Sequence, residues 1–333
     1  MTGIHSIPVR CRRWFSRRLA ILLLALPGLA AATPAAAQLL PCEAIELVVP
    51  WNAGGATDVM FRILAERYNA AGHMPRFDIR NVPGERGLTG ARLVAKAPAD
   101  GCTMLAGQDV VTLEHLSGNT DISPEAFAPV ARVALTPLIL ASANRAPFAV
   151  PGGIEPAFGK GEAPLLAAGF PGSIEYFVIL AFSQAIGVQP EFRSYLSPRR
   201  TVRALIDGEI LISEVSPAAA AAGARDGSFR LLGITAAHRA PAMPDLPTLR
   251  EQGIEFVFDV ERGIFAPAGT PEALRLAIAA NLSDVLAEPE IEKIFTEKLT
   301  RPAWLGPAAF EERIEKAAEA WKTVADRAGL TRP

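Results

Sequence analysis

Strands and helices alternate along this chain, and the alternation restricts the fold more than any other feature of the sequence. An apolar run at 47–49 predicts a buried strand, and the helix that follows its glycine turn has Thr57 or Asp58 as the expected cap. Further strands are expected at 77–81 and 103–106, with a helix between them. This order predicts βαβ units and a doubly wound, mainly parallel sheet flanked by helices.

The same alternation returns in the second half of the chain. Two strands are expected at 130–133 and 138–141, and a segment rich in proline and glycine at 147–164 then marks a change of region. Strands and helices alternate again from residue 165 to about residue 235. Residues 256–266 are largely apolar and extended, so we expect them to return the chain to the first region.

The length of the chain predicts two lobes, because a typical domain has about 100 to 200 residues. Each of the last three expected helices begins near a proline, at 271–287, 289–299 and 307–329, and we expect them to pack on the first lobe. The predicted organisation is lobe 1 at 38–141 and 264–333, and lobe 2 at 142–263.

The N-terminus has the pattern of a signal peptide. Several arginines precede an uncharged apolar run at 19–32, and Ala35 and Ala37 supply the small residues of a cleavage site, so we predict removal of residues 1–37. The pair Arg17 and Arg18 resembles part of a twin-arginine signal, which leaves the general secretory and twin-arginine routes both open. Either route leads to the periplasm. No later apolar run reaches the roughly 20 residues of a membrane-spanning helix, so a soluble mature protein is expected.

Charge and residue usage argue against several classes of function. The formal net charge is -2, and loss of the five arginines of the signal leaves 28 basic against 35 acidic residues, which argues against a nucleic-acid partner. The four histidines have no metal-ligand spacing with each other or with the cysteines, so neither a metal nor a cofactor is expected. The chain also lacks the motifs of nucleophile elbows, phosphate loops and zinc proteases, so we predict that it is not an enzyme.

Two glycine turns carry the predicted binding chemistry. The loop from Asn52 to Asp58 joins a buried strand to a helix at the carboxyl edge of the predicted sheet, where ligands bind in such folds. The free amides and dipole of the helix N-terminus favour a carboxylate or another oxyanion. Gly172 and Ser173 occupy the equivalent position in lobe 2. The alternative is purely structural: tight turns, helix caps and an ion pair between Asp58 and Arg62.

An ordered series of motifs resembles the tripartite tricarboxylate transporter substrate-binding receptors, also called Bug-type receptors. The segments that carry the resemblance are V-V-P-W-N-A-G-G-A-T-D-V-M-F-R at 48–62, N-V-P-G-E-R-G at 81–87, D-G-C-T-M-L at 100–105, L-G-I-T-A at 232–236, P-D-L-P-T at 244–248 and F-A-P-A-G-T-P at 265–271. The resemblance implies a type II periplasmic binding protein that holds its ligand carboxylate with the first loop and its lobe-2 counterpart. It also implies membrane permease subunits as partners.

The sequence departs from this family in lobe 2. Tyr176 stands where histidine is common, and the segment 193–197 keeps only Tyr195 of the usual pattern, so the identity of the ligand stays open. Glu175 and Glu214 are suited to a cationic or hydroxyl group on the ligand, or are simply solvated. The candidate ligand-binding residues are Trp51, Asn52, Gly54, Gly55, Ala56, Thr57, Asp58, Gln108, Gly172, Ser173, Ile174, Glu175, Tyr195 and Glu214. Trp51 either walls the pocket or packs between the lobes.

Cys42 and Cys102 precede strands that we expect to be neighbours at the amino edge of the first sheet. Adjacent strands lie about 4.8 Å apart, which suits the Cα separation of a disulfide. We therefore predict a disulfide between them; the alternative is two buried free cysteines.

The sequence as a whole favours a monomeric periplasmic receptor that captures a small organic carboxylate between two lobes and hands it to a membrane transporter. A periplasmic sensor subunit for a signalling system is the first alternative. An enzyme on the same fold is the second.

Overall fold

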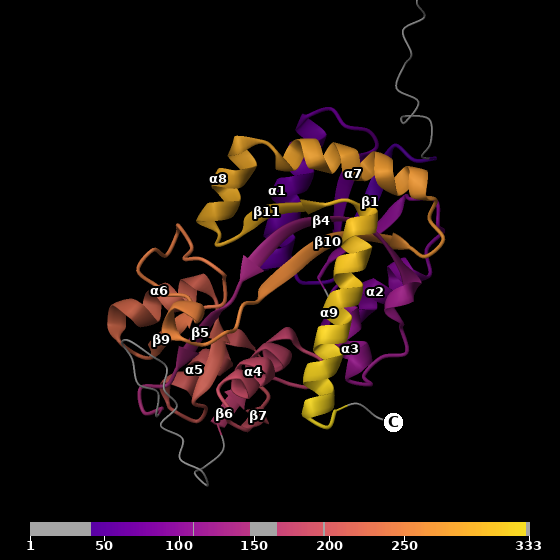
Figure 1. Ribbon diagram of the computed structural model, residues 1–333. Coiled ribbons are helices and arrows are strands. Elements are labelled where there is room, and N and C mark those ends of the chain that lie inside the picture. The colour runs from indigo at the N-terminus through magenta and orange to yellow at the C-terminus, as the bar shows by residue number, and fades with distance from the viewer. Residues whose placement is uncertain (1–40, 109, 147–164, 196, 331–333) are drawn as a thin grey trace, which may run out of the picture. The chain divides into compact units, whose positions relative to one another are not determined.

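The computed structural model describes residues 41–108, 110–146, 165–195 and 197–330 (Figure 1). The predicted signal peptide at 1–37 and the proline- and glycine-rich segment at 147–164 lie outside these ranges. The helices and strands are β1 (Ala44–Val49), α1 (Ala56–Ala70), β2 (Arg76–Asn81), η2 (Glu85–Gly87), α2 (Leu88–Ala95), β3 (Thr103–Gly107), α3 (Val110–Leu116), η3 (Pro124–Ala126), β4 (Phe127–Pro137), β5 (Ile139–Ser142), β6 (Leu165–Ala168), α4 (Ile174–Ala185), β7 (Pro190–Arg193), α5 (Pro198–Ile206), β8 (Ile212–Val215), α6 (Pro217–Asp226), β9 (Arg230–Ile234), η4 (Arg250–Gln252), β10 (Asp259–Pro267), α7 (Glu272–Leu286), α8 (Pro289–Glu297), β11 (Arg301–Leu305) and α9 (Pro307–Arg327).

The first sheet has six strands in the order β11-β4-β10-β3-β1-β2. β1 pairs in parallel with β2 and β3, as the βαβ pattern predicts. β10 runs antiparallel to β3 and β4, and β11 runs antiparallel to β4. The sheet is therefore mixed, and the prediction of a mainly parallel sheet is wrong. The reason is the path of the chain: β4 leads toward the second sheet and β10 returns from it, so these neighbours run in opposite directions.

The second sheet has five strands in the order β7-β6-β8-β5-β9. β6 is parallel to β7 and β8, whereas β5 is antiparallel to β8 and β9, so this sheet is mixed too. β5 was expected in lobe 1, and that part of the predicted boundary is wrong. β4 already ends at Pro137, and the pairing of Ile139 with Val215 and Ile234 fixes β5 in the second sheet.

The two connections between the sheets are joined by one buried threonine. The Thr235 hydroxyl accepts a hydrogen bond from the Leu138 amide at 2.8 Å and donates one to the Phe258 carbonyl at 2.6 Å. The Thr235 amide donates to the Leu138 carbonyl, and the Phe258 amide donates to the Thr235 carbonyl. Leu138 lies between β4 and β5, and Phe258 directly precedes β10. Thr235 thus ties the outgoing and returning chains together where they cross.

Each sheet has its own apolar core. α1 places Phe61, Leu64 and Tyr68 on one face with spacings of three and four residues, and all three are fully buried in the core of the first sheet. Burial of side chains of this size contributes about 1.5 to 3 kcal/mol each. In the second sheet, Phe177 and Phe182 of α4 have the same role.

The C-terminal helices agree with the predicted positions, but α9 contacts both lobes. It packs on β4 of the first sheet and also on α4, which covers the second sheet (Figure 1). The Trp321 ring of α9 meets Phe177 edge-on, with centroids 5.6 Å apart, and Phe258 at 5.4 Å. The expected packing on lobe 1 therefore holds for α9, and α9 also reaches the second lobe, because its apolar face continues past the end of the first sheet to Trp321.

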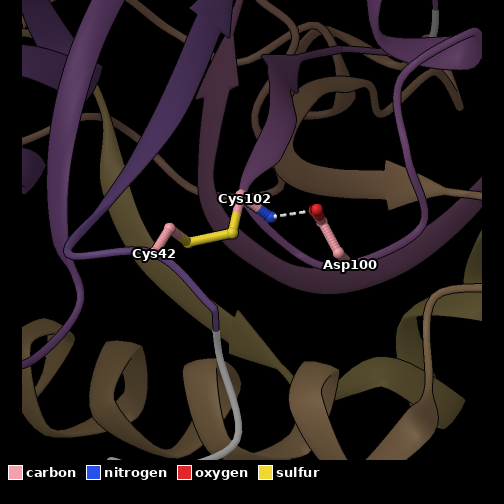
Figure 2. Close-up of a disulfide and its surroundings, with 3 residues drawn as sticks. All are labelled: Cys42, Asp100 and Cys102. Atoms are coloured by element: carbon pink, nitrogen blue, oxygen red, sulfur yellow. Dashed lines mark hydrogen bonds between the residues drawn. A yellow bond between two sulfur atoms is a disulfide. The ribbon is translucent and has the colours of Figure 1, made fainter.

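Cys42 and Cys102 form a disulfide with a Cα separation of 6.0 Å (Figure 2). Cys102 directly precedes β3, the parallel partner of β1, which places the bond at the amino edge of the sheet. The Cys102 amide donates to the Asp100 carboxylate at 2.9 Å, and this contact fixes the turn that leads into β3.

Candidate functional site

The turn between β1 and α1 is organised by the Asp58 carboxylate, which is almost fully buried. It accepts hydrogen bonds from the Gly54 amide at 2.8 Å, from the Arg62 guanidinium at 3.0 Å and from the Asn81 side-chain amide at 2.8 Å. Burial disfavours the charged form, but these donors outweigh it and hold the pKa of Asp58 below its ordinary value. The predicted ion pair between Asp58 and Arg62 is confirmed.

Neither Thr57 nor Asp58 is the cap of α1, so that prediction is wrong. The N-cap is Gly55, whose extended backbone (φ -70°, ψ 162°) precedes the first helical residue. Asp58 instead reaches back, one position before the cap, to the amide of Gly54. Gly54 has a φ of 80°, which explains why a glycine is needed in this turn.

The N-terminus of α1 has unpaired donors next to an exposed turn. Residues 52–56 are exposed, and the first three helical amides, those of Ala56, Thr57 and Asp58, have no hydrogen-bond acceptor among the residues that the structure describes. The Gly55 amide, in contrast, donates to the Asn52 carbonyl at 3.2 Å. A helix start with open amides and a positive dipole end is suited to bind an oxyanion.

Trp51 packs inside lobe 1. It is partly buried and contacts two apolar clusters of the first lobe, and its carbonyl accepts a hydrogen bond from Asn81 at 3.0 Å. The buried indole N–H has no acceptor among the described residues. These contacts lie within lobe 1, so they differ from the packing between the lobes that was one of the two roles expected for Trp51.

The second turn is held against lobe 1 by a buried glutamate. Gly172 has a φ of 100°, and a side chain built on it would collide with the Glu114 carboxylate and the Asn119 amide. Glu114 is fully buried, pairs with Arg86, and accepts a hydrogen bond from Asn119 at 2.7 Å. Asn119 also donates to the Pro171 carbonyl at 2.7 Å. Gly172 is therefore needed for this close packing.

Ser173 is the N-cap of α4, as expected, and its hydroxyl accepts a hydrogen bond from the Tyr176 amide at 3.1 Å. The amides of Ile174 and Glu175, the first two residues of α4, have no acceptor within the described part of the chain. This helix start therefore combines a conventional cap with open donors, so the structural and ligand-binding interpretations of Ser173 are compatible.

A cavity of about 590 Å³ opens beside this helix start. Its walls come from the ends of β6 and β8 and from the starts of α4, α5 and α6. The lining includes Ser173, Glu175, Tyr195, Arg199, Ser213 and Glu214. Phe170 and Tyr195 also line a second hollow of about 430 Å³, whose other walls include Arg86 and Asn119 of lobe 1. Four candidate residues of lobe 2, Ser173, Glu175, Tyr195 and Glu214, thus meet in one cavity. Gly172 does not line it, and Ile174 lines a different hollow.

Glu214 lies on β8 between two buried neighbours, Ser213 and Val215. Burial, with a smaller contribution from the nearby Glu175 carboxylate, raises the pKa of Glu214 to about 8. Burial also raises the pKa of Tyr195. At neutral pH Glu214 therefore holds a proton for most of the time in the absence of a positively charged neighbour.

Other candidates lie elsewhere. Gln108 lines a separate, largely apolar hollow with Leu105 and Phe265, on the side of β3 that faces α9. Residues 52–58 are not among those that line the cavity beside Ser173.

The described residues contain no cluster of histidine, cysteine and acidic side chains that suits a metal ion. None of the helices in the described ranges is long and apolar enough to span a membrane.

Several residues of these networks were missing from the predicted site. Asn81, Arg86 and Glu114 fix the two turns, although each is distant in sequence from the residue that it holds. Asn81 and Arg86 lie in the segment 81–87, which had been noted only for its resemblance to a family motif. Glu114 had no comparable signal.

Two mixed α/β sheets, joined by two strands that pass between them and carrying a cavity with acidic and basic side chains at the strand ends, define a two-lobed solute-binding protein. A family model described as "Tripartite tricarboxylate transporter family receptor" matches residues 74–330. The chain therefore belongs to this family of receptors.

Individual relatives agree with this assignment. A UPF0065 protein of Bordetella bronchiseptica is 29% identical over 300 residues, which cover 88% of each chain. An R. palustris protein, Rpa4515, solved with adipate, is 26% identical with a TM-score of 0.72 and covers 86% of this chain and 97% of its own. MatC from Rhodopseudomonas palustris, solved with bound malate, is 25% identical with a TM-score of 0.67, covering 86% of this chain and 99% of its own. The predicted type II binding-protein fold is confirmed.

Proposed function

We propose that this protein is a periplasmic receptor that captures a small organic carboxylate between its two lobes and delivers it to membrane permease subunits. One observation carries the proposal: α1 begins with three open amides on an exposed turn that Asp58 holds in place. The adipate and malate complexes of the two R. palustris relatives support a carboxylate as the ligand class. The predicted signal peptide supports the periplasm as the location.

The two lobes have different parts in this proposal. The α1 amides of lobe 1 hold the ligand carboxylate, and the cavity beside Ser173 in lobe 2 receives the remainder of the molecule. Movement about the strand crossing at Thr235 closes the lobes over the ligand, and the closed form is the one that the permease recognises. The receptor acts as a monomer and has no catalytic step, so it releases its ligand unchanged.

A thermal-shift screen of small carboxylates against the mature protein tests the proposal. A ligand present at about 100 times its dissociation constant adds about 2.7 kcal/mol to stability, which gives a clear rise in melting temperature. The matched controls are the uncharged amides of the same acids, which lack the oxyanion and are expected to give no shift. Equal stabilisation by an acid and its amide would contradict the role of the α1 amides. Chemical change of the recovered ligand would contradict a receptor.

A further inference from the structure

The cavity beside Ser173 has an unusual arrangement of charge. Glu214 is half-buried, on a strand between buried neighbours, whereas Glu175 and Arg199 are exposed. Within the residues that the structure describes, no hydrogen bond or ion pair joins the side-chain charges of these three residues to other groups. Elsewhere in the described residues, acidic side chains such as Glu261 form ion pairs with basic ones, in this case with Arg132. The cavity therefore contains ionisable side chains that the fold itself leaves unpaired.

The two glutamates act on each other. The Glu175 carboxylate opposes ionisation of Glu214, and burial opposes it more strongly, so the pKa of Glu214 rises to about 8. A group with a positive charge between the two carboxylates would relieve both effects, because opposite charges attract most strongly where water is scarce. A second carboxylate on the ligand would instead add a negative charge beside Glu175 and would oppose ionisation of Glu214 further.

The cavity also has one positively charged side chain. Arg199 is the second residue of α5, is exposed, and lines the same cavity as the two glutamates. The cavity thus has one basic and two acidic side chains, of which Glu214 is the most buried. A molecule that is positive at one end and negative at the other finds a partner for each of its charges in this cavity.

We propose that the ligand is an amino carboxylate, whose ammonium group binds between Glu175 and Glu214 while its carboxylate remains near Arg199 and the α1 amides. This inference rests on the proposed function, since it assumes capture of a carboxylate. It adds that the other end of the ligand carries an ammonium group. Glu175 and Glu214 are then the residues that determine specificity, and the open cavity of about 590 Å³ accommodates a molecule of amino-acid size.

Matched sets of ligands separate the inference from the proposed function. Each set has one carbon-chain length, from four to six carbons, and contains the plain monocarboxylate, the dicarboxylate, the ω-amino acid and the α-amino acid. Binding to the mature protein is measured by calorimetry at pH 7.5. We expect an amino acid to bind at least about tenfold more tightly than the dicarboxylate of the same length, with the monocarboxylate between them.

Variants assign the preference to the two glutamates. Glu214→Gln and Glu175→Gln keep the shape of the side chain, and each is expected to reduce the amino-acid preference about tenfold. Glu175 is exposed, so its variant is expected to fold even if Glu214→Gln does not. Glu191→Gln is the matched control: Glu191 is exposed in the same lobe and is not among the residues that line the cavity, so its variant is expected to behave as the natural protein.

The outcomes are distinct. Tighter binding of dicarboxylates, or an amino-acid preference that survives both glutamine variants, overturns this inference and leaves the carboxylate receptor in place. Failure of every carboxylate in every set to bind contradicts the proposed function itself, and this inference with it.

Discussion

The carboxylate of Asp58 lies 2.8 Å from the backbone amide of Gly54, across the turn that leads from β1 into α1. This single contact has both a structural and a functional consequence for the loop. It satisfies a buried charge, and it sets the position of the amides that follow it on α1.

Replacement of Asp58 by asparagine removes the charge and keeps most of the shape. Because the carboxylate is buried with three donors, we expect the free energy of unfolding at pH 7 to fall by about 1 to 3 kcal/mol. The control is Asp78→Asn, which breaks the exposed ion pair with Arg76 and is expected to cost less than about 1 kcal/mol. Chemical denaturation of both variants measures the difference.

The loss of stability in Asp58→Asn should depend on pH. The folded protein lowers the pKa of Asp58 below 3.8, so its contribution to stability is complete above that pH and is lost as the pH falls through the folded value. The stability gap between the natural protein and Asp58→Asn should therefore be constant at neutral pH and shrink in acid. A gap that widens in acid would show that the contacts of Asp58 do not favour its charged form.

Gly172→Ala tests the close packing of the second turn on lobe 1. The positive φ costs about 1 kcal/mol or more for alanine, and the collision with Glu114 adds to it, so we expect a total loss of about 2 to 4 kcal/mol. Gly187→Ala is the control, because Gly187 has a φ of 72° but nothing within 4 Å of the added carbon. Equal losses for the two variants in thermal denaturation would mean that Glu114 does not restrict Gly172.

The disulfide between Cys42 and Cys102 spans 60 residues of sequence, and its removal is expected to cost about 2 to 5 kcal/mol. Titration of the denatured protein that starts at Gln38 should find no free thiol before reduction and two after it. Two thiols before reduction would contradict the bond.

Glu214 makes the protein less stable as pH rises. Its pKa of about 8 in the folded protein lies above the ordinary value of 4.5, so the folded state holds the proton in this interval and the unfolded state does not. Stability contributed by the protonated group is therefore present below about pH 4.5 and declines until about pH 8, by about 1.4 kcal/mol for each pKa unit. Denaturation of Glu214→Gln across this range should show a smaller decline. An identical decline in both proteins would refute the shift.

Binding of the ligand should ionise the Glu214 carboxyl group. An ammonium group beside Glu214, with Glu175, Tyr195 and Arg199 as the other ionisable groups of the cavity, favours the ionised carboxylate, so binding at pH 7 releases a proton. Calorimetry in buffers of different ionisation enthalpy detects this release. Its loss in Glu214→Gln would identify the source.

Much of the first lobe could be predicted from local sequence. The apolar run Leu47, Val48 and Val49 gave β1, and prolines marked the starts of α8 and α9. β11 was missed, because its five residues include Pro302 and exposed Arg301 and have no alternating pattern. It is a strand because β4 pairs with it, and such a contact is set by the tertiary fold.

The candidate site was predictable where a motif and its chemistry coincide within a few residues. Gly54 and Asp58 lie in one turn, so their spacing was informative. Glu114 lies nearly sixty residues before Gly172, and only the fold brings the two together. For the same reason the sequence could not show that Gln108 lines a separate hollow, since its strand end faces α9.

Titration of Ala56→Pro with a carboxylate that stabilises the natural protein tests the central claim most directly. Ala56 is the first residue of α1 and follows an extended Gly55, so proline fits there and removes one open amide without breaking the helix. Ala56→Ser, which keeps the amide, is the control. The account predicts an unchanged melting temperature and an affinity about tenfold lower for the proline variant alone. Equal affinities for the natural protein and both variants would contradict it.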